Sequence, residues 1–344
     1  MKYFYPVILF CLIISCRKEK MAVPPAAPVS TVKITPPVPP LHPAGPKITS
    51  AEYIDSLLFV NKNNYQVQTT DTGAAFASTD PHITISANGL ISRLVSAEVV
   101  AITVTWKNPR FAPTTIYVLG ATDNNQVMPF LHYQGALATD AYAAYVQGWK
   151  TLQQLPDPTS TYAIILRHAD ASCGADCGNF PGAPSGWWKR TDSVYVRQLN
   201  QQGIDRATQL GQIFKDLNYP IKRVFTSEYY RARQTAALIN AGPVPVQDST
   251  INHPTHNNYA PGLFLGMAGI LSNQPLDNRM TLIVAHHPLN ELRTVNGYAT
   301  FPSVTPFNWT GAYFVKVELD GTLTYHGAAS WGMFKRWRDM KLKL

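Results

Sequence analysis

Arginine and histidine residues follow three short, apolar-rich segments of this 344-residue chain, at residues 163–166, 223–226 and 282–285. Arg167 and His168 come directly after the first segment and His286 directly after the third, whereas the second is followed by Ser227 and, four residues on, by Arg231. Guanidinium groups stay charged and bind phosphate through paired hydrogen bonds. A histidine beside them can act as a nucleophile. These residue types therefore point to chemistry on a phosphoryl group.

The elements that must position these side chains alternate along the chain. The three apolar segments have the composition of strands buried on both faces. A helix is expected at 201–217, with Asn200 as its N-cap. Residues 312–319 and 322–325 lie on either side of a turn signal and predict an antiparallel hairpin. We therefore expect an α/β three-layer domain with a mostly parallel central sheet over residues 159–344.

This architecture brings the candidate residues together. Ligands bind outside the carboxyl ends of the strands in open α/β sheets, so Arg167, His168, Arg231 and His286 should converge at one edge. A helix expected to begin near Ser227 would add backbone N–H groups and a dipole that favours an anion. The sequence predicts a pocket for a phosphoryl group at this edge.

Four blocks of sequence resemble the histidine phosphatase superfamily, also called phosphoglycerate-mutase-like. They are residues 166–169 (LRHA), 199–211 (LNQQGIDRATQLG), 226–236 (TSEYYRARQTA) and 283–286 (IVAH). Their order and spacing are similar to those of the family across about residues 160–300. The resemblance implies a metal-independent phosphomonoester hydrolase that needs no cofactor and acts on a small phosphorylated substrate.

The resemblance also implies a role for each matching residue. His168 would attack phosphorus in line and carry the phosphoryl group. Arg167, Arg231 and His286 would hold the non-bridging oxygens and stabilise their charge in the transition state. Water would then release phosphate.

The sequence departs from the family's usual pattern in two places. Ala169 stands where many members have glycine. The family often has a glutamate as proton donor between the block matched here by residues 226–236 and its last histidine, and this chain has no glutamate between residues 237 and 286. A histidine can serve as a general acid, so His253 is the first candidate donor, Asp248 the second and Asp170 the third.

The N-terminus has the features of a bacterial lipoprotein signal. Lys2 precedes an apolar core at 7–14 that is too short to span a bilayer as a helix. Residues 13–16 resemble a lipobox, which implies that residues 1–15 are removed and that Cys16 is lipidated. An ordinary secretory signal with a chance cysteine is the alternative. We expect an envelope protein held to the membrane by its lipid, periplasmic or surface-exposed.

Residues 16–50 are expected to be a tether. Nine of the 27 prolines lie in residues 21–50, which cannot form a core. The formal charge of +8 gathers largely at residues 17–20 and 335–343, on a tether and a tail. This distribution, together with the lack of a binding motif, argues against a nucleic-acid partner.

The exported location affects the expectation for Cys173 and Cys177. Two thiols four residues apart in an oxidising compartment predict a small disulfide loop, with a zinc site as the weaker alternative. They fall in a stretch at 171–190 that looks like an insertion near the pocket. Trp187 and Trp188 in this stretch are expected to form a packed lid, with substrate stacking as a second possibility.

Residues 51–120 are predicted to be a small all-β sandwich. The dipeptide Asn88-Gly89 predicts a hairpin turn, and apolar residues alternate from Val100 to Trp106. The run from Ser78 to Val104 resembles group 2 bacterial immunoglobulin-like domains. Residues 121–158 are expected to be a connector that contains a helix at 140–155.

Two other function classes compete with the phosphatase. A non-catalytic surface lipoprotein could bind a glycan or a protein partner through its immunoglobulin-like and phosphatase-like domains. Metal-dependent hydrolysis could use residues from the set His253, His256, His286, His287 and Asp248, but this set lacks any recognised ligand spacing. Phosphoglycerate mutase activity is disfavoured, since an exported protein would not meet glycolytic intermediates.

Overall fold

The computed structural model describes residues 45–60, 62, 64–95, 98–120, 137–171, 176, 182–252, 263–286 and 309–343. Four predicted sites, namely Cys16, Cys173, Cys177 and His253, lie outside the described residues. No helix in these ranges is both long and apolar enough to cross a membrane.

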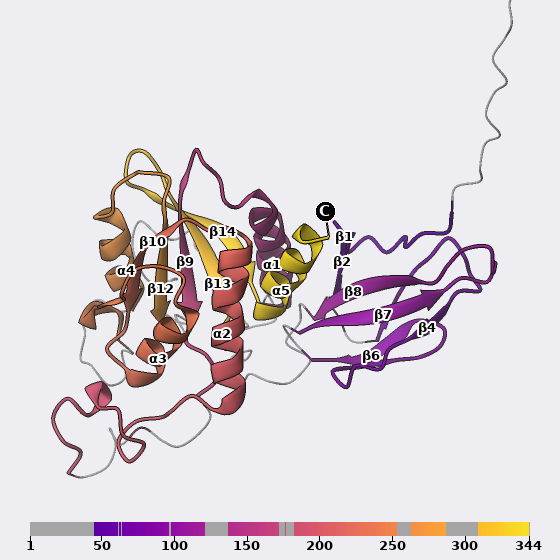
Figure 1. Cartoon of the computed structure of the whole chain (residues 1–344). Coiled ribbons are helices and arrows are strands. Elements are labelled where there is room, and N and C mark those ends of the chain that lie inside the picture. The colour runs from indigo at the N-terminus through magenta and orange to yellow at the C-terminus, as the bar shows by residue number, and fades with distance from the viewer. Residues whose placement is uncertain are drawn as a thin grey trace, which may run out of the picture. The chain divides into compact units, whose positions relative to one another are not determined.

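A six-stranded mixed sheet forms the centre of the C-terminal part (Figure 1). Its strands are β9 (Thr161–Arg167), β10 (Ile221–Thr226), β11 (Val246–Gln247), β12 (Met280–Ala285), β13 (Ala312–Val317) and β14 (Leu323–Ala329). The order is β11-β10-β12-β9-β13-β14, in which the first four strands are parallel and β13 is antiparallel to both of its neighbours. Every residue of β9 and β12 is buried, as expected for central strands. The predicted strands and the predicted hairpin are confirmed.

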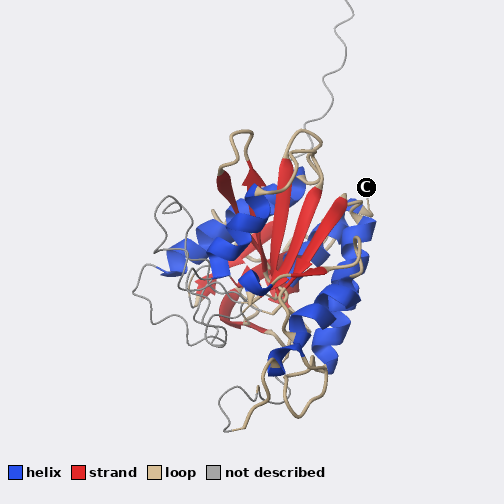
Figure 2. Ribbon diagram, turned by 90° about the vertical axis from the view of Figure 1, so that its left-hand side faces the viewer, coloured by secondary structure: helices blue, strands red, loops and turns tan. Residues whose placement is uncertain are grey.

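Helices cover both faces of this sheet (Figure 2). They are α1 (Leu137–Gln154), α2 (Gln201–Asp216), α3 (Tyr230–Ile239), α4 (Leu263–Ser272) and α5 (Trp331–Lys341), with short 3₁₀ turns η3 (Trp187–Lys189) and η4 (Ser249–Ile251). Consecutive residues of a strand point to opposite faces. In β13, the Tyr313 hydroxyl donates to Met267 Sδ of α4, whereas Phe314 packs edge-on against Phe334 of α5. Thus α4 and α5 lie on opposite faces, which gives three layers.

Helix α1 has a different role from the one expected. From the sequence, this helix was expected to be part of a connector between two domains. In the structure it packs along β14, and its Trp149 and Leu152 are fully buried in the core of the α/β domain. At the crossing, a Cβ on Gly148 would lie 1.8 Å from the carbonyl oxygen of Ala328. A fragment that began at residue 159 would expose this face, so the α/β unit includes α1.

Helix α2 begins where the sequence predicts. The Asn200 side chain accepts a hydrogen bond from the backbone N–H of Gly203 at 2.8 Å, which caps the first turn. Ala207, Leu210 and Phe214 form the buried stripe. The N-terminus of α2 lies against the chain just after His168, because a Cβ on Gly203 would lie 2.3 Å from the carbonyl oxygen of Asp170.

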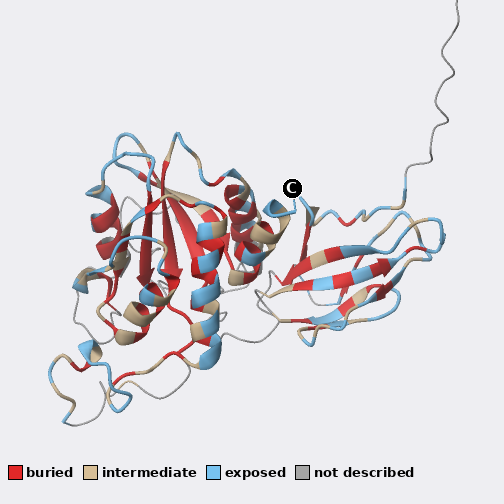
Figure 3. Ribbon diagram, viewed as in Figure 1, coloured by how far each residue is buried: buried red, intermediate tan, exposed pale blue. Residues whose placement is uncertain are grey.

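Residues 45–120 form two sheets around a shared apolar core. The strands are β1 (Tyr53–Ile54), β2 (Leu57–Val60), β3 (Tyr65–Gln66), β4 (Ala75–Ala77), β5 (Ile83–Ile85), β6 (Leu90–Leu94), β7 (Val99–Thr105) and β8 (Thr114–Gly120). Burial alternates along β7 as predicted (Figure 3). Gly89 turns the chain between β5 and β6 at φ 87°, a left-handed conformation that favours glycine. The immunoglobulin-like assignment of this region stays a prediction.

Candidate active site

His168 lies at the carboxyl end of β9 and is held by the sheet. Its backbone N–H donates to the carbonyl of Ala285 at 2.9 Å, and its ring is buried. The ring Nδ1 lies 2.8 Å from the carbonyl oxygen of Ala169, and Arg231 Nε donates to the ring Nε2 at 3.1 Å. A carbonyl only accepts and a guanidinium only donates, so both contacts require the proton to be on Nδ1. The lone pair of His168 is therefore on Nε2.

The surroundings keep His168 neutral. Burial lowers its pKa well below 6.5, and the positive charges of Arg231 and Arg167 lower it further, against the opposing effect of the hydrogen bond to Ala169. The imidazole is thus unprotonated at pH 7. A buried, neutral imidazole with an oriented lone pair is the state that a nucleophile needs.

Arg231 is the second residue of α3 and is also buried. Thr235, one turn later, accepts from the backbone N–H of Ala169 and donates to the carbonyl of Arg231, which ties α3 to the loop that follows the nucleophile. Burial lowers the pKa of Arg231 to about 10, and the charge of Asp176 opposes this shift. The guanidinium stays charged at pH 7. The helix begins at Tyr230, three residues after the expected start.

Arg167 directly precedes His168 in the sequence and is buried as well. Its guanidinium carbon is 3.7 Å from the ring centroid of Trp309, a cation–π contact, and the same ring lies 5.1 Å from the His168 ring. Burial lowers the pKa of Arg167 to about 9, with repulsion from Arg197 and Arg231 adding to the effect. Trp309 was not anticipated from the sequence.

His286 follows β12 and completes the predicted group. Its ring centroid is 5.3 Å from that of His168, in an edge-on arrangement. Its Nε2 lies 2.8 Å from Ser227 Oγ, and the Tyr229 ring packs against it at 4.8 Å. The structure thus brings together all four residues that the sequence predicted for the site: Arg167, His168, Arg231 and His286.

Asp176 and Arg197 join the site although sequence analysis did not find them. Arg231 Nη1 donates to both oxygens of Asp176 at 2.9 and 3.1 Å, and Arg197 donates to the same carboxylate through Nε and its backbone N–H at 3.2 and 3.1 Å. The charge of Arg197 lowers the pKa values of Arg167 and His168, so it faces the same cluster. Its position two residues before Leu199, at the start of the second block, was the available signal.

Residues 186–250 match the family described as Histidine phosphatase superfamily (branch 1). The match confirms the resemblance for these residues, which include Arg231; Arg167, His168 and His286 lie outside them. No curated protein sequence matches the chain.

Several solved structures of phosphatases are similar to this chain at low identity. The protein histidine phosphatase SixA complexed with tungstate is 21% identical over 49% of this chain and 97% of its own, with a TM-score of 0.36. A putative phosphohistidine phosphatase SixA from Agrobacterium tumefaciens is 20% identical over 50% and 98%, with a TM-score of 0.34. A phosphoserine phosphatase mutant from Entamoeba histolytica is 16% identical over 50% and 98%, with a TM-score of 0.32.

The candidate proton donors lie in different places relative to His168 and the arginines. Asp170 is buried, and its charge acts on Arg167. Asp248 follows β11, three strand positions from β9, or roughly 14 Å at about 4.8 Å per strand. Its carboxylate accepts from the backbone N–H and the hydroxyl of Thr250 at 2.8 and 2.6 Å. His253 lies outside the described residues.

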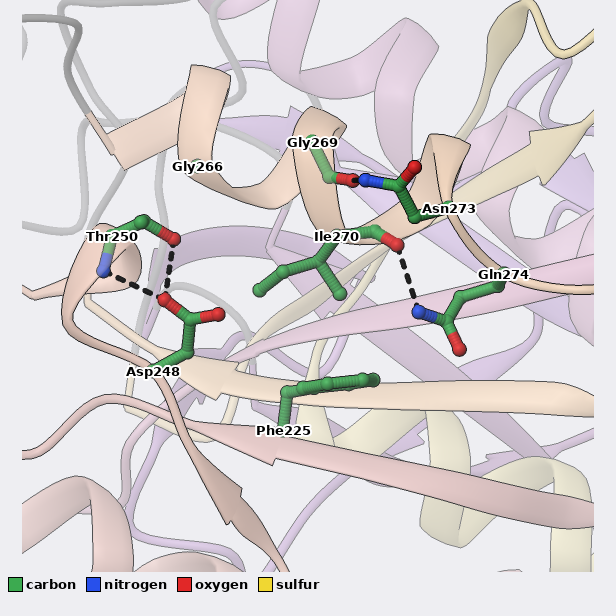
Figure 4. A pocket seen from close by; sticks show the side chains of 8 residues that line it. All are labelled: Phe225, Asp248, Thr250, Gly266, Gly269, Ile270, Asn273 and Gln274. Carbon is green, nitrogen blue, oxygen red and sulfur yellow. Dashed lines mark hydrogen bonds between the residues drawn. The ribbon is translucent and has the colours of Figure 1, made fainter.

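Asp248 instead lines a separate pocket of about 370 Å³ between α4 and the sheet edge (Figure 4). Phe225 and Ile270 form its apolar walls, and Gln274 lies at the far end. None of the four predicted site residues lines it. The structure therefore does not bring Asp248 to the nucleophile.

The tryptophans of the 171–190 stretch are packed, as the first of the two expectations had it. Trp187 is buried and meets the Tyr229 ring edge-on at 5.7 Å. Trp188 lies nearly parallel to that ring at 6.5 Å and donates through Nε1 to Glu228. Among the described residues, no group of three or more His, Cys, Asp or Glu is placed to hold a metal ion.

Proposed function

We propose that the chain is a phosphomonoester hydrolase that works through a phosphohistidine on His168. The observation that carries this proposal is the tautomer of His168, whose Nδ1–H is tied to Ala169 while Nε2 presents its lone pair to a cluster of arginines. In the first step Nε2 attacks phosphorus, the bond from phosphorus to the ester oxygen breaks, and that oxygen takes a proton. In the second step water attacks phosphorus, the nitrogen–phosphorus bond breaks, and phosphate leaves.

The arginines supply the charge that this reaction requires. In the resting site Arg231 donates to the same Nε2 that attacks, so it must turn toward the phosphoryl oxygens as substrate enters. Arg167 is poised beside the nucleophile, and both groups are buried, where a fixed charge stabilises a developing anion more strongly than in water. His286 completes the set of donors to the phosphoryl group.

The proton for the leaving group has two candidates near the arginines, Asp170 and Asp176. The carboxylate of Asp176 is bound to Arg231 and Arg197 in the resting site and would be released when a phosphoryl group competes for Arg231. His253, the first candidate from the sequence, stays a prediction.

Turnover of a phosphomonoester panel with chelator present tests the proposal. We expect hydrolysis of at least one class among sugar phosphates, nucleotides, inositol phosphates and phosphoproteins, unaffected by the chelator. A folded protein that hydrolyses none of them, nor p-nitrophenyl phosphate, would favour the non-catalytic surface protein that binds a glycan or a protein partner.

We further propose that the enzyme is exported, lipidated on Cys16 and held at the membrane, with Cys173 and Cys177 in a disulfide. Fractionation of cells that express Cys16→Ser tests the anchor, and the variant should leave the membrane fraction. Thiol titration of the denatured, unreduced mature protein tests the disulfide and should find no free thiol. Two reactive thiols, or bound zinc, would contradict it.

A further inference from the structure

The residues around Ser227 form a closed set of hydrogen bonds next to His286. Ser227, Asn252 and His286 are each 1% exposed or less. Asn252 Oδ1 accepts from Ser227 Oγ and from the backbone N–H of Glu228, both at 2.8 Å, and its Nδ2 donates to Glu228 Oε2 at 2.9 Å. Because an N–H only donates and a carboxylate only accepts, these contacts fix which way the Asn252 amide faces.

The Glu228 end of this set is itself firmly held. Lys189 Nζ lies 2.7 Å from Oε1, and Trp188 Nε1 donates to Oε2 at 3.1 Å. Burial alone would raise the pKa of Glu228, but the hydrogen bonds from Lys189, Asn252 and Trp188 outweigh it, and the pKa is lowered. Glu228 is therefore a carboxylate that anchors the Asn252 amide.

The fixed amide decides the protons on Ser227 and His286. A serine hydroxyl has one proton to donate and two lone pairs. That proton must go to Asn252 Oδ1, since two acceptor oxygens at 2.8 Å would otherwise face each other. The lone pairs of Ser227 then accept from the backbone N–H of Tyr229 at 3.2 Å and from His286 Nε2 at 2.8 Å. His286 consequently carries a proton on Nε2.

We propose that Asn252 is a positioning residue which, through Ser227, fixes the His286 ring with its Nε2–H turned to Ser227, so that the second proton with which His286 donates to the phosphoryl group is held on Nδ1. The two histidines of the site are then held in opposite tautomers, with the proton on Nδ1 in His168 and on Nε2 in His286. This role rests on the proposed phosphatase function, whereas the tautomer itself can be measured on the resting protein.

Two substitutions and their combination test the chain of contacts. Asn252→Ala frees the Ser227 hydroxyl to donate to Nε2, so the His286 proton should move to Nδ1. We expect kcat/KM to fall about 100-fold, because His286 then meets the phosphoryl group as a neutral donor and no longer as a cation. Ser227→Ala should cause a similar fall. The double variant should be no worse than either single one, because Asn252 acts through Ser227.

The readouts separate positioning from loss of structure. ¹⁵N NMR of His286 reports which nitrogen carries the proton, and thermal unfolding reports stability. If Asn252→Ala fails to fold, N252D is tested in its place. It keeps an acceptor for the Ser227 hydroxyl but places a second carboxylate against that of Glu228. N252D/E228Q restores a donor–acceptor pair and should recover activity relative to N252D. Asn273→Ala is the matched control, because Asn273 is an exposed residue of α4 that donates to the carbonyl of Gly269.

Two outcomes would overturn the proposal: a wild-type His286 with its neutral-form proton on Nδ1, or losses in N252A and S227A that multiply in the double variant. A wild-type protein with the proton on Nε2 but no phosphatase activity would overturn the proposed function instead, while the contact between Asn252, Ser227 and His286 would stand.

Discussion

The two folded regions of the chain differ in what they bury. Among the described residues 45–120, the core is apolar and Ser50 is the one buried polar side chain. The α/β domain buries two arginines, two histidines and an aspartate around a single sheet edge, listed here as Arg167, Arg231, His168, His286 and Asp170. Buried charge is unfavourable for folding unless it is compensated. The contrast indicates that the buried residues of the β region serve to pack its core. The buried charged residues at the sheet edge of the α/β domain serve the chemistry of the site instead.

The largest loss of activity is expected for a substitution of His168 in the α/β domain. His168→Ala should lower kcat/KM by at least about 1000-fold, because it removes the nucleophile. A phosphoenzyme that is stable in base and labile in acid should form in the wild type and be absent from the variant, as measured by acid–base stability of trapped label. Full activity in His168→Ala would contradict the proposal of a phosphohistidine intermediate.

An arginine in each region gives a matched pair. Arg231→Ala should cost about 1000-fold in kcat/KM, since the developing charge loses a preorganised donor. Arg110→Ala, at an exposed position of the β region, should leave kcat/KM within about twofold. Equal effects in steady-state assays of the two variants would remove the distinction between the regions.

A core substitution in the β region should have the reverse effect. Ile102→Ala leaves a cavity in the apolar core and should destabilise this region by about 3 kcal/mol. Chemical denaturation followed by fluorescence measures the stability, and kcat/KM should stay near the wild-type value. A large loss of activity at temperatures where the variant is folded would show that the β region contributes to catalysis.

The smallest expected effect is a dependence of stability on pH. The folded pKa of His168 is depressed, so below about pH 6.5 the unfolded chain takes up a proton at this residue that the folded chain does not. Its contribution to stability is present above pH 6.5 and is lost as pH falls. Between pH 7 and 5.5 the wild type should lose about 1 kcal/mol more stability than His168→Asn, as measured by denaturation at each pH. Parallel curves would mean that His168 titrates normally.

The sequence predicted the elements and residues that depend on local pattern. Strands β9, β10 and β12 could be predicted from short apolar runs, and α2 from its Asn200 cap. The four central site residues followed because each stands at the end of a strand or in the first turn of a helix. Because the carboxyl ends of parallel strands lie at the same edge of a sheet, these four residues were expected to converge there.

What the sequence missed depends on contacts between distant segments. Asp176 and Arg197 meet Arg231 from a stretch without periodicity, and Trp309 reaches Arg167 from the other end of the domain. Asp248 was a candidate because it is a rare carboxylate in its stretch, but its neighbour Thr250 holds it in another pocket. Periodicity found α1 but could not name its packing partner, which comes late in the chain.

The close approach of α1 to β14 has a consequence for the order in which the protein is made. Gly148 and Gly327 meet at the crossing, yet β14 begins about 170 residues after α1 ends. At the usual 5–20 residues per second, a growing chain presents the apolar face of α1 for roughly ten to thirty seconds before β14 exists. The α/β domain therefore cannot close while it is being synthesised. Such a delay leaves time for chaperones to bind the apolar face of α1 before the domain forms.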